Sequence, residues 1–490
     1  MKLSQLLGEV EVLTAAADLE REITGVSYDS RQTQEGDLFA AISGFAADGH
    51  KFIPMAAERG AVCVLCERPP AIDIPYILVP DSRLALAQVS AAFFGHPAAE
   101  LTMVGVTGTN GKTTTTYLLK DILEKAAGAK VGLIGTNQNM IGDQAIHTER
   151  TTPESYELQK LFRQMADAGC THVVMEVSSH ALFLKRVAGV RFAVGIFTNL
   201  TQDHLDFHGT MEAYCDAKAQ LFQVSDTGVY NADDPWTPRL MEKATCQKTA
   251  VSAQGEADLW AENIRLGAAG IAFDAVKSDS RTKIEVAIPG GFMVYNTLGV
   301  LAAAEALGIS LEQSAAVLRR SAHVKGRLEV VPTDGDYTIL IDYAHTPDAL
   351  ENVLRAVKGF AKGRTVALFG CGGDRDRTKR PKMGRIAADN ADFVIVTSDN
   401  PRTEDPEAII ADILPGVTEG SAPYVTVTGR VEAIHYAIDH AESGDVIVLC
   451  GKGHEDYQEI DHVKYHLDER EVVAAYLKER ARRGEKTKEP

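Results

Sequence analysis

The hydrophobic pattern of this chain alternates short apolar runs with longer segments of helical spacing. The short run Met103 to Val106 predicts a buried parallel strand, and the helical pattern from Tyr117 to Ala126 follows it. Further strand candidates are VGLIGT, THVVMEV and FAVGIFT, and helical patterns separate the first two. Strands that alternate with helices in this way predict a doubly wound, mostly parallel sheet.

The same pattern occurs at both ends of the chain. Near the N-terminus, the runs AVCVLC and YILVP alternate with helical segments at 52–59 and 83–94. From about residue 330, the strand candidates YTILIDY, RTVALFG, ADFVIVTS and DVIVLCG again alternate with helices. Before them, IAFDAVKSDSRTKIEVAIPG alternates like an antiparallel hairpin. We therefore expect an α/β fold with three domains: a small N-terminal α/β domain (1–98), a central doubly wound, mostly parallel sheet with an added antiparallel sheet (99–329), and a C-terminal Rossmann-like doubly wound domain (330–490).

A glycine-rich loop joins the first central strand to its helix, with the sequence Gly108-Thr109-Asn110-Gly111-Lys112-Thr113. Small residues let backbone N–H groups approach phosphate oxygens, and the helix N-terminus adds the positive end of its dipole. Lys112 would reach the β- and γ-phosphates, and Thr113 or Thr114 would offer a hydroxyl to Mg²⁺. The first glycine of the strict Walker pattern would fall on Val106, so this is a variant P-loop. We expect the central domain to bind ATP; a glycine-rich loop without function is the alternative.

Polar residues follow the predicted central strands, at the edge where ligands gather in parallel sheets. Glu176 stands at a strand end and fits as an oxygen ligand for Mg²⁺. His204, between Asp203 and Asp206, is either a nitrogen ligand to a second metal or a structural histidine, and the spacing leaves both open. The C-terminal strands also end in polar or glycine residues. A second ligand edge predicts a cleft in which ATP meets a second substrate.

The composition narrows the class of protein. The net charge of −18 over 490 residues argues against general affinity for nucleic acid. No apolar stretch reaches the ~18 residues of a membrane span, and acidic residues interrupt the N-terminal segment where a signal peptide needs an apolar core. Seven scattered cysteines suit a reducing compartment, and Cys63 and Cys66 are expected in the core because no second pair follows at zinc spacing. We expect a cytoplasmic, monomeric enzyme that acts on small molecules, without a nucleic-acid partner or membrane span.

In combination, seven motifs resemble the Mur ligases, the ATP-dependent amide-forming enzymes of peptidoglycan precursor synthesis. They occur in the family's order: TGTNGKTTT (107–115), EVSSH (176–180), TNLTQDHLDFHG (198–209), the helix containing Ala217-Lys218, YNTLGVLAA (295–303), GRLE (326–329) and DYAHTPDAL (342–350). The resemblance implies a ligase that adds meso-diaminopimelate to the D-glutamate of UDP-N-acetylmuramoyl-L-alanyl-D-glutamate.

The resemblance assigns the amino-acid substrate to the C-terminal ligand edge. Asp399-Asn400-Pro401-Arg402 is the motif associated with diaminopimelate rather than lysine. Arg402 can clamp the distal carboxylate through two hydrogen bonds, while Asp399 or Glu455 meets the ammonium. Lysine lacks that carboxylate and would leave Arg402 unpaired, which disfavours it. The structural alternative is a proline turn with a surface ion pair. The resemblance implies that three further residues complete the site: Arg375, Gly451 and Glu455.

By the same resemblance, the UDP-linked substrate lies between the first two domains. Its uridine end would be approached by Ser30 and the stretch Phe45-Ala46-Ala47. Its sugar and peptide would be held by Thr151, Thr152, Ser178 and Arg186. Leu184 departs from relatives that carry glutamine there, which removes one polar contact.

The family's reaction implies roles for the remaining residues. ATP would phosphorylate the D-glutamate carboxylate, and the amine of diaminopimelate would attack the acyl phosphate. Lys112 and two Mg²⁺ ions would supply positive charge, with Thr113 or Thr114, Glu176 and His204 as ligand sources. The family's lysine that matches Lys218 is carbamylated and ligates the second metal, whereas helix spacing alone predicts an exposed lysine. Contacts to adenine and ribose would come from Asn296, Arg327 and Asp342.

Several other activities remain as alternatives. The L-lysine-adding form of the same ligase differs only at the amino-acid site. Tetrahydrofolate polyglutamation and the next Mur step use the same fold. Two N-terminal turn motifs, Tyr28-Asp29-Ser30-Arg31 and Gly36-Asp37-Leu38-Phe39, argue against both activities, as does Asp399-Asn400-Pro401-Arg402. A P-loop ATPase switch would hydrolyse ATP without ligation and leave the C-terminal ligand edge unexplained. A binding module without catalysis would not need the occupied catalytic positions.

Overall fold

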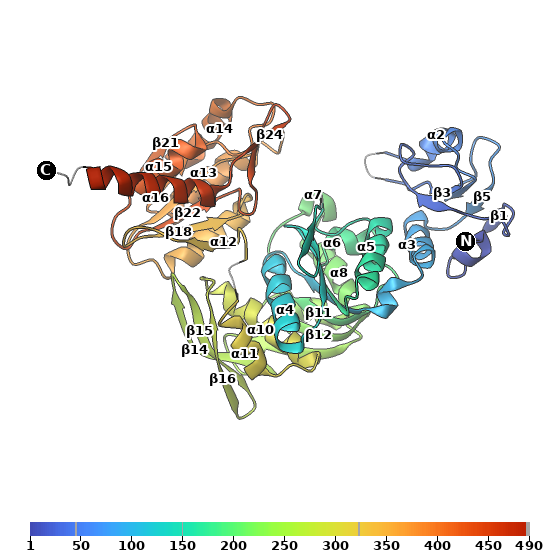
Figure 1. Cartoon of the computed structure of the whole chain (residues 1–490), viewed down its shortest axis with the longest axis horizontal. Coiled ribbons are helices and arrows are strands. Elements are labelled where there is room, and N and C mark those ends of the chain that lie inside the picture. The colour runs from blue at the N-terminus through green and yellow to red at the C-terminus, as the bar shows by residue number, and fades with distance from the viewer. Residues whose placement is uncertain (45–46, 149, 322–323, 487–490) are drawn as a thin grey trace. The chain divides into compact units, whose positions relative to one another are not determined.

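The computed structural model describes residues 1–44, 47–148, 150–321 and 324–486 (Figure 1). These residues form two compact units. The first comprises Met1–Leu200, His204–Val251 and Gly299–Ser310, and the second comprises Thr201–Asp203, Ser252–Leu298 and Leu311–Pro490. Each of the three predicted α/β regions contains its own sheet. Among the described residues, no helix has the length and apolar character needed to cross a bilayer.

The N-terminal region holds a five-stranded sheet in the order β1-β5-β4-β3-β2, antiparallel only between β1 and β5. Its elements are α1 (Leu3–Leu6), β1 (Thr14–Ala16), β2 (Gly25–Ser27), β3 (Asp37–Ala40), α2 (Ile53–Glu58), β4 (Cys63–Cys66), β5 (Tyr76–Leu78) and α3 (Ser82–Phe93). The predicted strands and helices of this region are confirmed. Cys63 and Cys66 are buried and unpaired in β4, which confirms them as core residues. Burial raises the pKa of these thiols to about 12 and about 11.

The rest of the first unit contains the sheet β13-β12-β11-β6-β10-β7-β8-β9. Its strands run parallel from β13 to β7, and only β8 and β9 are antiparallel. The strands are β6 (Thr102–Thr107), β7 (Val131–Ile134), β8 (Asn139–Ile141), β9 (Gln144–Ile146), β10 (His172–Glu176), β11 (Phe192–Phe197), β12 (Ser225–Asn231) and β13 (Gln247–Ser252). The helices are α4 (Lys112–Ala127), α5 (Ser155–Asp167), α6 (Ser179–Phe183), α7 (Leu205–His208), α8 (Met211–Ala219) and α9 (Thr237–Glu242). The doubly wound, mostly parallel sheet is thus confirmed.

Two helices start earlier than their apolar spacing indicates. Helix α4 begins at Lys112 rather than near Tyr117, and the run Thr113 to Thr116 forms its first turn. These threonines are buried in the core. Threonine is a poor helix former, so tertiary packing overrides propensity here. The small-residue pattern TLGVLAAAEALG predicts a helix that opens at Asn296. Helix α10 (Phe292–Ala306) instead begins just after Gly290 and Gly291, so Asn296 lies inside it.

The second unit contains three antiparallel strands, β14 to β16, and a doubly wound sheet. The predicted hairpin is β15 (Gly270–Lys277) and β16 (Ser280–Val286), and β14 (Leu259–Gly267) adds a third antiparallel strand. Helix α11 (Leu311–Leu318) contacts β16. The doubly wound sheet has the order β17-β18-β22-β19-β20-β21, parallel except at β17.

The C-terminal sheet is covered by helices on both faces (Figure 1). Alternate strand residues such as Ile341 and Leu368 pack against α15 and α16 in one core. Its elements are β17 (Glu329–Val331), β18 (Thr338–Asp342), α12 (Pro347–Lys358), β19 (Thr365–Phe369), α13 (Lys379–Asn390), β20 (Phe393–Val396), α14 (Pro406–Glu419), β21 (Tyr424–Thr426), α15 (Arg430–Asp439), β22 (Val446–Cys450), β23 (Tyr457–Ile460), β24 (Val463–His466) and α16 (Glu469–Lys486). This architecture confirms the predicted Rossmann-like domain.

Candidate active site

The glycine-rich loop lies between β6 and the N-terminus of α4, as predicted. Gly108 has φ +149° and Gly111 has φ +85°, both in the region that favours glycine. A Cβ on Gly108 would collide with the hydroxyl of Thr198 and approach the backbone of Asn199 to 3.1 Å. The loop is anchored there, because the backbone N–H of Asn110 donates to Oδ1 of Asn199 over 2.9 Å. The strand, loop and 16-residue helix together form the framework of a phosphate site.

Two lysines converge on the carbonyl of Gly108. Nζ of Lys112 donates to this oxygen over 2.9 Å and to the carbonyl of Thr109 over 2.8 Å. Nζ of Lys218, on α8, donates to the Gly108 carbonyl over 2.8 Å and lies 4.4 Å from the ring centre of Tyr214. Lys218 is only 1% exposed, so the surface position that helix spacing alone predicts is wrong. The ammonium of Lys112 places positive charge on the P-loop, where phosphate would bind.

Glu176 ends β10 and connects three further residues. Its Oε1 accepts a hydrogen bond from the hydroxyl of Thr113 over 2.9 Å, and its two oxygens accept from the N–H and hydroxyl of Thr136 over 2.9 and 3.0 Å. The hydroxyls of Thr136 and Thr151 are 3.0 Å apart. A carboxylate next to a P-loop hydroxyl is the donor set that Mg²⁺ prefers. Thr113 and Glu176 therefore fit this ion, while Thr114 is buried on the same turn.

His204 is the N-cap residue just before α7 and has a left-handed φ of +53°. Its ring packs edge-on against His180, with ring centres 4.8 Å apart, and lies 6.0 Å from the ring of Tyr214. Over the described parts of the chain, no three histidine, cysteine or acidic side chains are grouped so that they could hold a metal. The ligand roles of His204 and Lys218 remain predictions.

The residues predicted to hold sugar and peptide meet after β10. The hydroxyl of Thr152 donates to the carbonyl of Glu176 over 2.9 Å and accepts from the N–H of Ser178 over 3.1 Å. Nη1 of Arg186 donates to the carbonyl of Thr152 over 3.0 Å. Arg186 also forms an ion pair with Glu154, an 8%-exposed acid that none of the sequence motifs indicated. Burial lowers the pKa of Arg186, and Glu154 partly offsets this effect.

The structure describes two of the four predicted uridine contacts, Ser30 and Ala47. Phe45 and Ala46 lie outside the described residues. Ala47 is exposed, and its carbonyl accepts a hydrogen bond from the N–H of Gly44 over 3.0 Å. Ser30 is buried, and its hydroxyl donates to the sulfur of Met55 over 3.4 Å. Leu184 is 9% exposed, so the position that departs from the family packs as a core residue.

The three predicted nucleotide contacts belong to the second unit. Asn296 is 2% exposed. The carboxylate of Asp342 accepts from the N–H groups of Leu328 and Ala344 over 2.8 and 2.9 Å, and burial raises its pKa. The guanidinium of Arg327 lies 5.2 Å from the ring centre of Tyr343. Asp342 and Arg327 are close enough for the arginine to lower the pKa of the acid.

At the C-terminal ligand edge, Asn400 joins residues from two loops. Its Nδ2 donates to Oε2 of Glu455 over 2.9 Å. Its Oδ1 accepts from Nζ of Lys452 and from the N–H of Glu459, each over 3.0 Å. Lys452 also contacts Glu455 at 3.0 Å. The structure thus brings the predicted pair Asn400 and Glu455 together, and it adds Lys452 and Glu459, which the motifs did not indicate.

Arg402 is held by acceptors of its own domain. Its Nη1 donates to the carbonyl of Gly373 over 2.8 Å and its Nε to Glu459 over 3.1 Å. The side chain is 18% exposed, and φ is +52°, a strained value for a residue with a Cβ. A Cβ on Gly372 would lie 2.9 Å from Nη1 of Arg402 and 3.8 Å from Cγ of Arg375, so both arginines flank this glycine. The ion pair of the structural alternative is present, but in a half-enclosed site next to a second arginine.

Asp399 and Gly451 face each other across the same edge. Oδ1 of Asp399 accepts from the N–H of Asn400 over 2.7 Å, whereas Oδ2 is buried and accepts no hydrogen bond from the described residues. Gly451 has φ +115°, and a Cβ there would lie 2.5 Å from this oxygen. A buried carboxylate oxygen without a donor is suited to an ammonium group that arrives with a ligand.

Comparison with known proteins places the chain in a family. The descriptions "Mur ligase family, catalytic domain", "Mur ligase middle domain" and "Mur ligase, glutamate ligase domain" match residues 22–108, 106–304 and 326–453. The chain is 47% identical over 468 residues to the UDP-N-acetylmuramoyl-L-alanyl-D-glutamate--2,6-diaminopimelate ligase of Clostridium botulinum, covering 94% of this chain and 96% of that relative. It is 47% identical over 483 residues to a ligase of the same name, numbered 1, from Clostridium acetobutylicum, covering 98% of this chain and 100% of the relative.

A solved structure supports the same assignment. The structure of a UDP-N-acetylmuramoyl-L-alanyl-D-glutamate--2,6-diaminopimelate ligase superposes with a TM-score of 0.72 at 33% identity, covering 98% of this chain and 99% of that one. Sequence and fold therefore agree over nearly the whole length. The chain belongs to the Mur ligase family.

Proposed function

We propose that this protein is an ATP-dependent ligase that adds meso-diaminopimelate to the D-glutamate of UDP-N-acetylmuramoyl-L-alanyl-D-glutamate. The relatives named for this reaction match from end to end. The observation that carries the amino-acid assignment is Oδ2 of Asp399, a buried carboxylate oxygen that accepts no hydrogen bond from the described residues and faces Gly451. An amino-acid ammonium would supply the missing donor.

The proposed reaction proceeds through an acyl phosphate. Phosphoryl transfer from ATP to the D-glutamate carboxylate makes phosphate a leaving group, and attack by the amine of diaminopimelate forms the amide and releases phosphate. Both groups in the first step are anionic. Lys112, whose ammonium group donates to the Gly108 carbonyl, provides fixed positive charge at the P-loop. Thr152 and Arg186 orient the peptide end of the substrate next to Glu176.

Magnesium and the modified lysine belong to this proposal. Thr113 or Thr114 and Glu176 would hold one Mg²⁺, and His204 together with a carbamylated Lys218 would hold a second. When bound, these ions neutralise the phosphate oxygens. Asn296, Arg327 and Asp342 would contact adenine and ribose.

The amino-acid site, by our proposal, selects diaminopimelate over lysine. Arg402 and Arg375 flank Gly372 and would pair with the distal carboxylate. Asp399, Asn400 and Glu455 would then receive the ammonium group, because they already form a connected polar group at this edge.

Three domains follow from this division of roles: 1–98 for the UDP-linked substrate, 99–329 for ATP and 330–490 for the amino acid. We also propose a monomer in the cytoplasm. All seven cysteines are free, which supports a reducing compartment.

The test is phosphate release from ATP in the presence of the UDP-linked dipeptide, with meso-diaminopimelate, L-lysine or no amino acid. Release that depends on diaminopimelate, with a product heavier by that residue, supports the proposal. A preference for lysine would leave the family intact and contradict the role of Arg402. Equal release in all three reactions would identify an ATPase without ligation.

A further inference from the structure

A fully buried ion pair lies behind the amino-acid edge of the C-terminal domain. Arg430 opens α15 and Glu469 opens α16, and both side chains are 0% exposed. Nε of Arg430 donates to Oε1 of Glu469 over 2.8 Å. Removing two charges from water costs about as much as their attraction returns, so a buried pair contributes little net stability. Stability alone therefore does not account for this pair.

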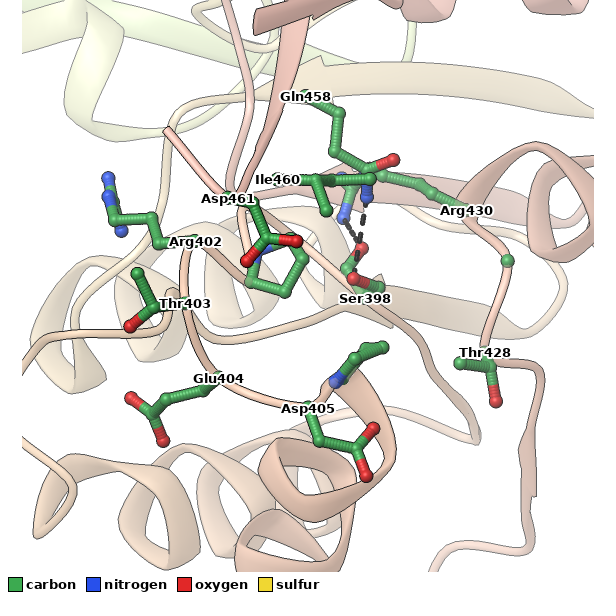
Figure 2. Close-up of a pocket in the computed structure, with 13 residues that line it drawn as sticks. Ser398, Arg402, Thr403, Glu404, Asp405, Thr428, Arg430, Gln458, Ile460 and Asp461 are labelled. Atoms are coloured by element: carbon green, nitrogen blue, oxygen red, sulfur yellow. Dashed lines mark hydrogen bonds between the residues drawn. The ribbon is translucent and has the colours of Figure 1, made fainter. Parts of the chain in front are cut away.

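The other nitrogens of Arg430 contact the ends of two strands. Nη2 donates to the carbonyl of Cys450, the last residue of β22, over 2.8 Å. Nη1 donates to the carbonyl of Ser398, just after β20, over 3.3 Å, and Figure 2 shows Arg430 and Gln458 directed at Ser398. These strands are not neighbours, because β19 lies between them. The planar guanidinium acts as a rigid spacer between the two strand ends.

Each strand end carries a residue of the proposed amino-acid site. Asp399 follows Ser398, and Gly451 follows Cys450. Oδ2 of Asp399 lies 3.8 Å from Nη1 of Arg430, within ion-pair range but without a hydrogen bond. Burial opposes ionisation of Asp399, yet Lys452 and Arg430 bring its pKa below the ordinary value. Arg430 stabilises the charge of this carboxylate and leaves its acceptor oxygen open.

A cavity of about 440 Å³ borders the same group (Figure 2). Its lining includes Ser398, Arg402, Asp405, Thr428, Arg430 and Gln458. A side chain shorter than arginine at position 430 would let water from this cavity reach the strand ends. The spacing of Asp399 and Gly451 would then no longer be fixed.

We propose that Arg430, paired with Glu469, is a positioning residue that holds Asp399 and Gly451 at the separation the amino-acid ammonium requires. It acts through the strand ends and does not touch substrate. This inference rests on the proposed function, because it takes this edge as the diaminopimelate site.

The test compares KM values for diaminopimelate, ATP and the UDP-linked dipeptide in Arg430→Lys and in the double variant Arg430→Met/Glu469→Gln. The Arg430→Lys substitution keeps the positive charge but loses the planar guanidinium group. The double variant removes both buried charges, so that neither is left buried without its partner. We expect both to raise KM for diaminopimelate by about tenfold or more, with the other two KM values within about twofold, because only one site loses its geometry.

The matched control is Arg364→Lys. Arg364 pairs with the buried Asp445 at 2.7 Å. These two residues directly precede β19 and β22, so they join the N-terminal ends of the strands, away from the amino-acid edge. This variant should lower the melting temperature without raising KM for diaminopimelate selectively. A parallel rise of all three KM values in the Arg430 variants, or an unchanged KM for diaminopimelate, would overturn the positioning role. Wild-type protein that does not use diaminopimelate would overturn the proposed function first, before any variant is compared.

Discussion

The hydroxyl of Thr113 donates a 2.9 Å hydrogen bond to Oε1 of Glu176, which joins the first turn after the P-loop to the end of the neighbouring strand β10. Glu176 is 1% exposed, so its charge is stabilised by donors rather than by water. Thr136 provides two of these donors and also contacts Thr151. One carboxylate therefore connects the proposed magnesium site to a residue predicted to bind the peptide.

Replacing Glu176 by glutamine should abolish most ligation while leaving the fold intact. The amide keeps the size of the side chain but removes the negative charge that would hold Mg²⁺. Losing a metal ligand or its direct partner typically costs about 10- to 100-fold or more in affinity or rate. The measurement is phosphate release against Mg²⁺ concentration. Glu124→Gln, which removes a helix ion pair with Lys120, is the control and should leave the curve unchanged.

Lys218→Arg should inactivate the enzyme without unfolding it. Arginine preserves the cation near Gly108 but cannot form the carbamate that the proposal requires. Wild-type activity should fall in buffer free of carbon dioxide and return on addition of bicarbonate, and ¹³C-labelled bicarbonate should give a carbamate signal in the NMR spectrum of the wild type only. An active Lys218→Arg enzyme would show that the ammonium charge alone is sufficient.

Arg402→Met should reduce selectivity for diaminopimelate. The variant loses the guanidinium that would pair with the distal carboxylate, so kcat/KM for diaminopimelate should fall about 100-fold, the scale of a lost charge-assisted pair. The value for L-lysine, which has no such carboxylate, should change little. Arg377→Met, an exposed arginine paired with Asp412, is the control. Equal losses for both amino acids would contradict the clamp.

The framework of the fold was predictable because it depends on local patterns. The run Met103 to Val106 has the composition of a buried strand, and Gly108 and Gly111 occupy positions whose φ values favour glycine. Polar residues at strand ends, such as Glu176 and Asp399, were predictable because parallel strands direct their ends to a common edge. The start of α4 was not predictable, because the run Thr113 to Thr116 is helical only through its packing in the core.

Residues that act through partners distant in sequence were not predictable. Glu154 becomes notable only because Arg186 folds back onto it, 32 positions later. Arg430 reaches Ser398, Cys450 and Glu469, and none of these contacts leaves a periodic or motif signal. A buried charged side chain can be recognised only once the structure shows which opposite charge lies next to it.

His454 gives the protein a defined sensitivity to acid. Burial, with Arg327, Lys325 and Arg470 nearby, lowers the pKa of His454 to about 4. In the unfolded chain this pKa would return to about 6.5. Between these values the unfolded state binds more protons, so stability falls as the pH drops from about 6.5 to about 4 and this histidine adds no further loss below that range.

A His454→Gln variant tests this origin, because glutamine cannot titrate. Its melting temperature should fall less steeply than that of the wild type between pH 6.5 and 4, so the difference between variant and wild type should grow in favour of the variant. His466→Gln is the control of opposite sign. A hydrogen bond to Glu471 raises the pKa of the exposed His466. The protonated histidine therefore stabilises the fold at low pH, and this contribution is lost as the pH rises through the raised pKa of His466. If His454→Gln showed the same slope as the wild type, the acid sensitivity would have to come from other groups, and His180 and His208, whose pKa values are also lowered to about 4 by burial, would be the next to replace.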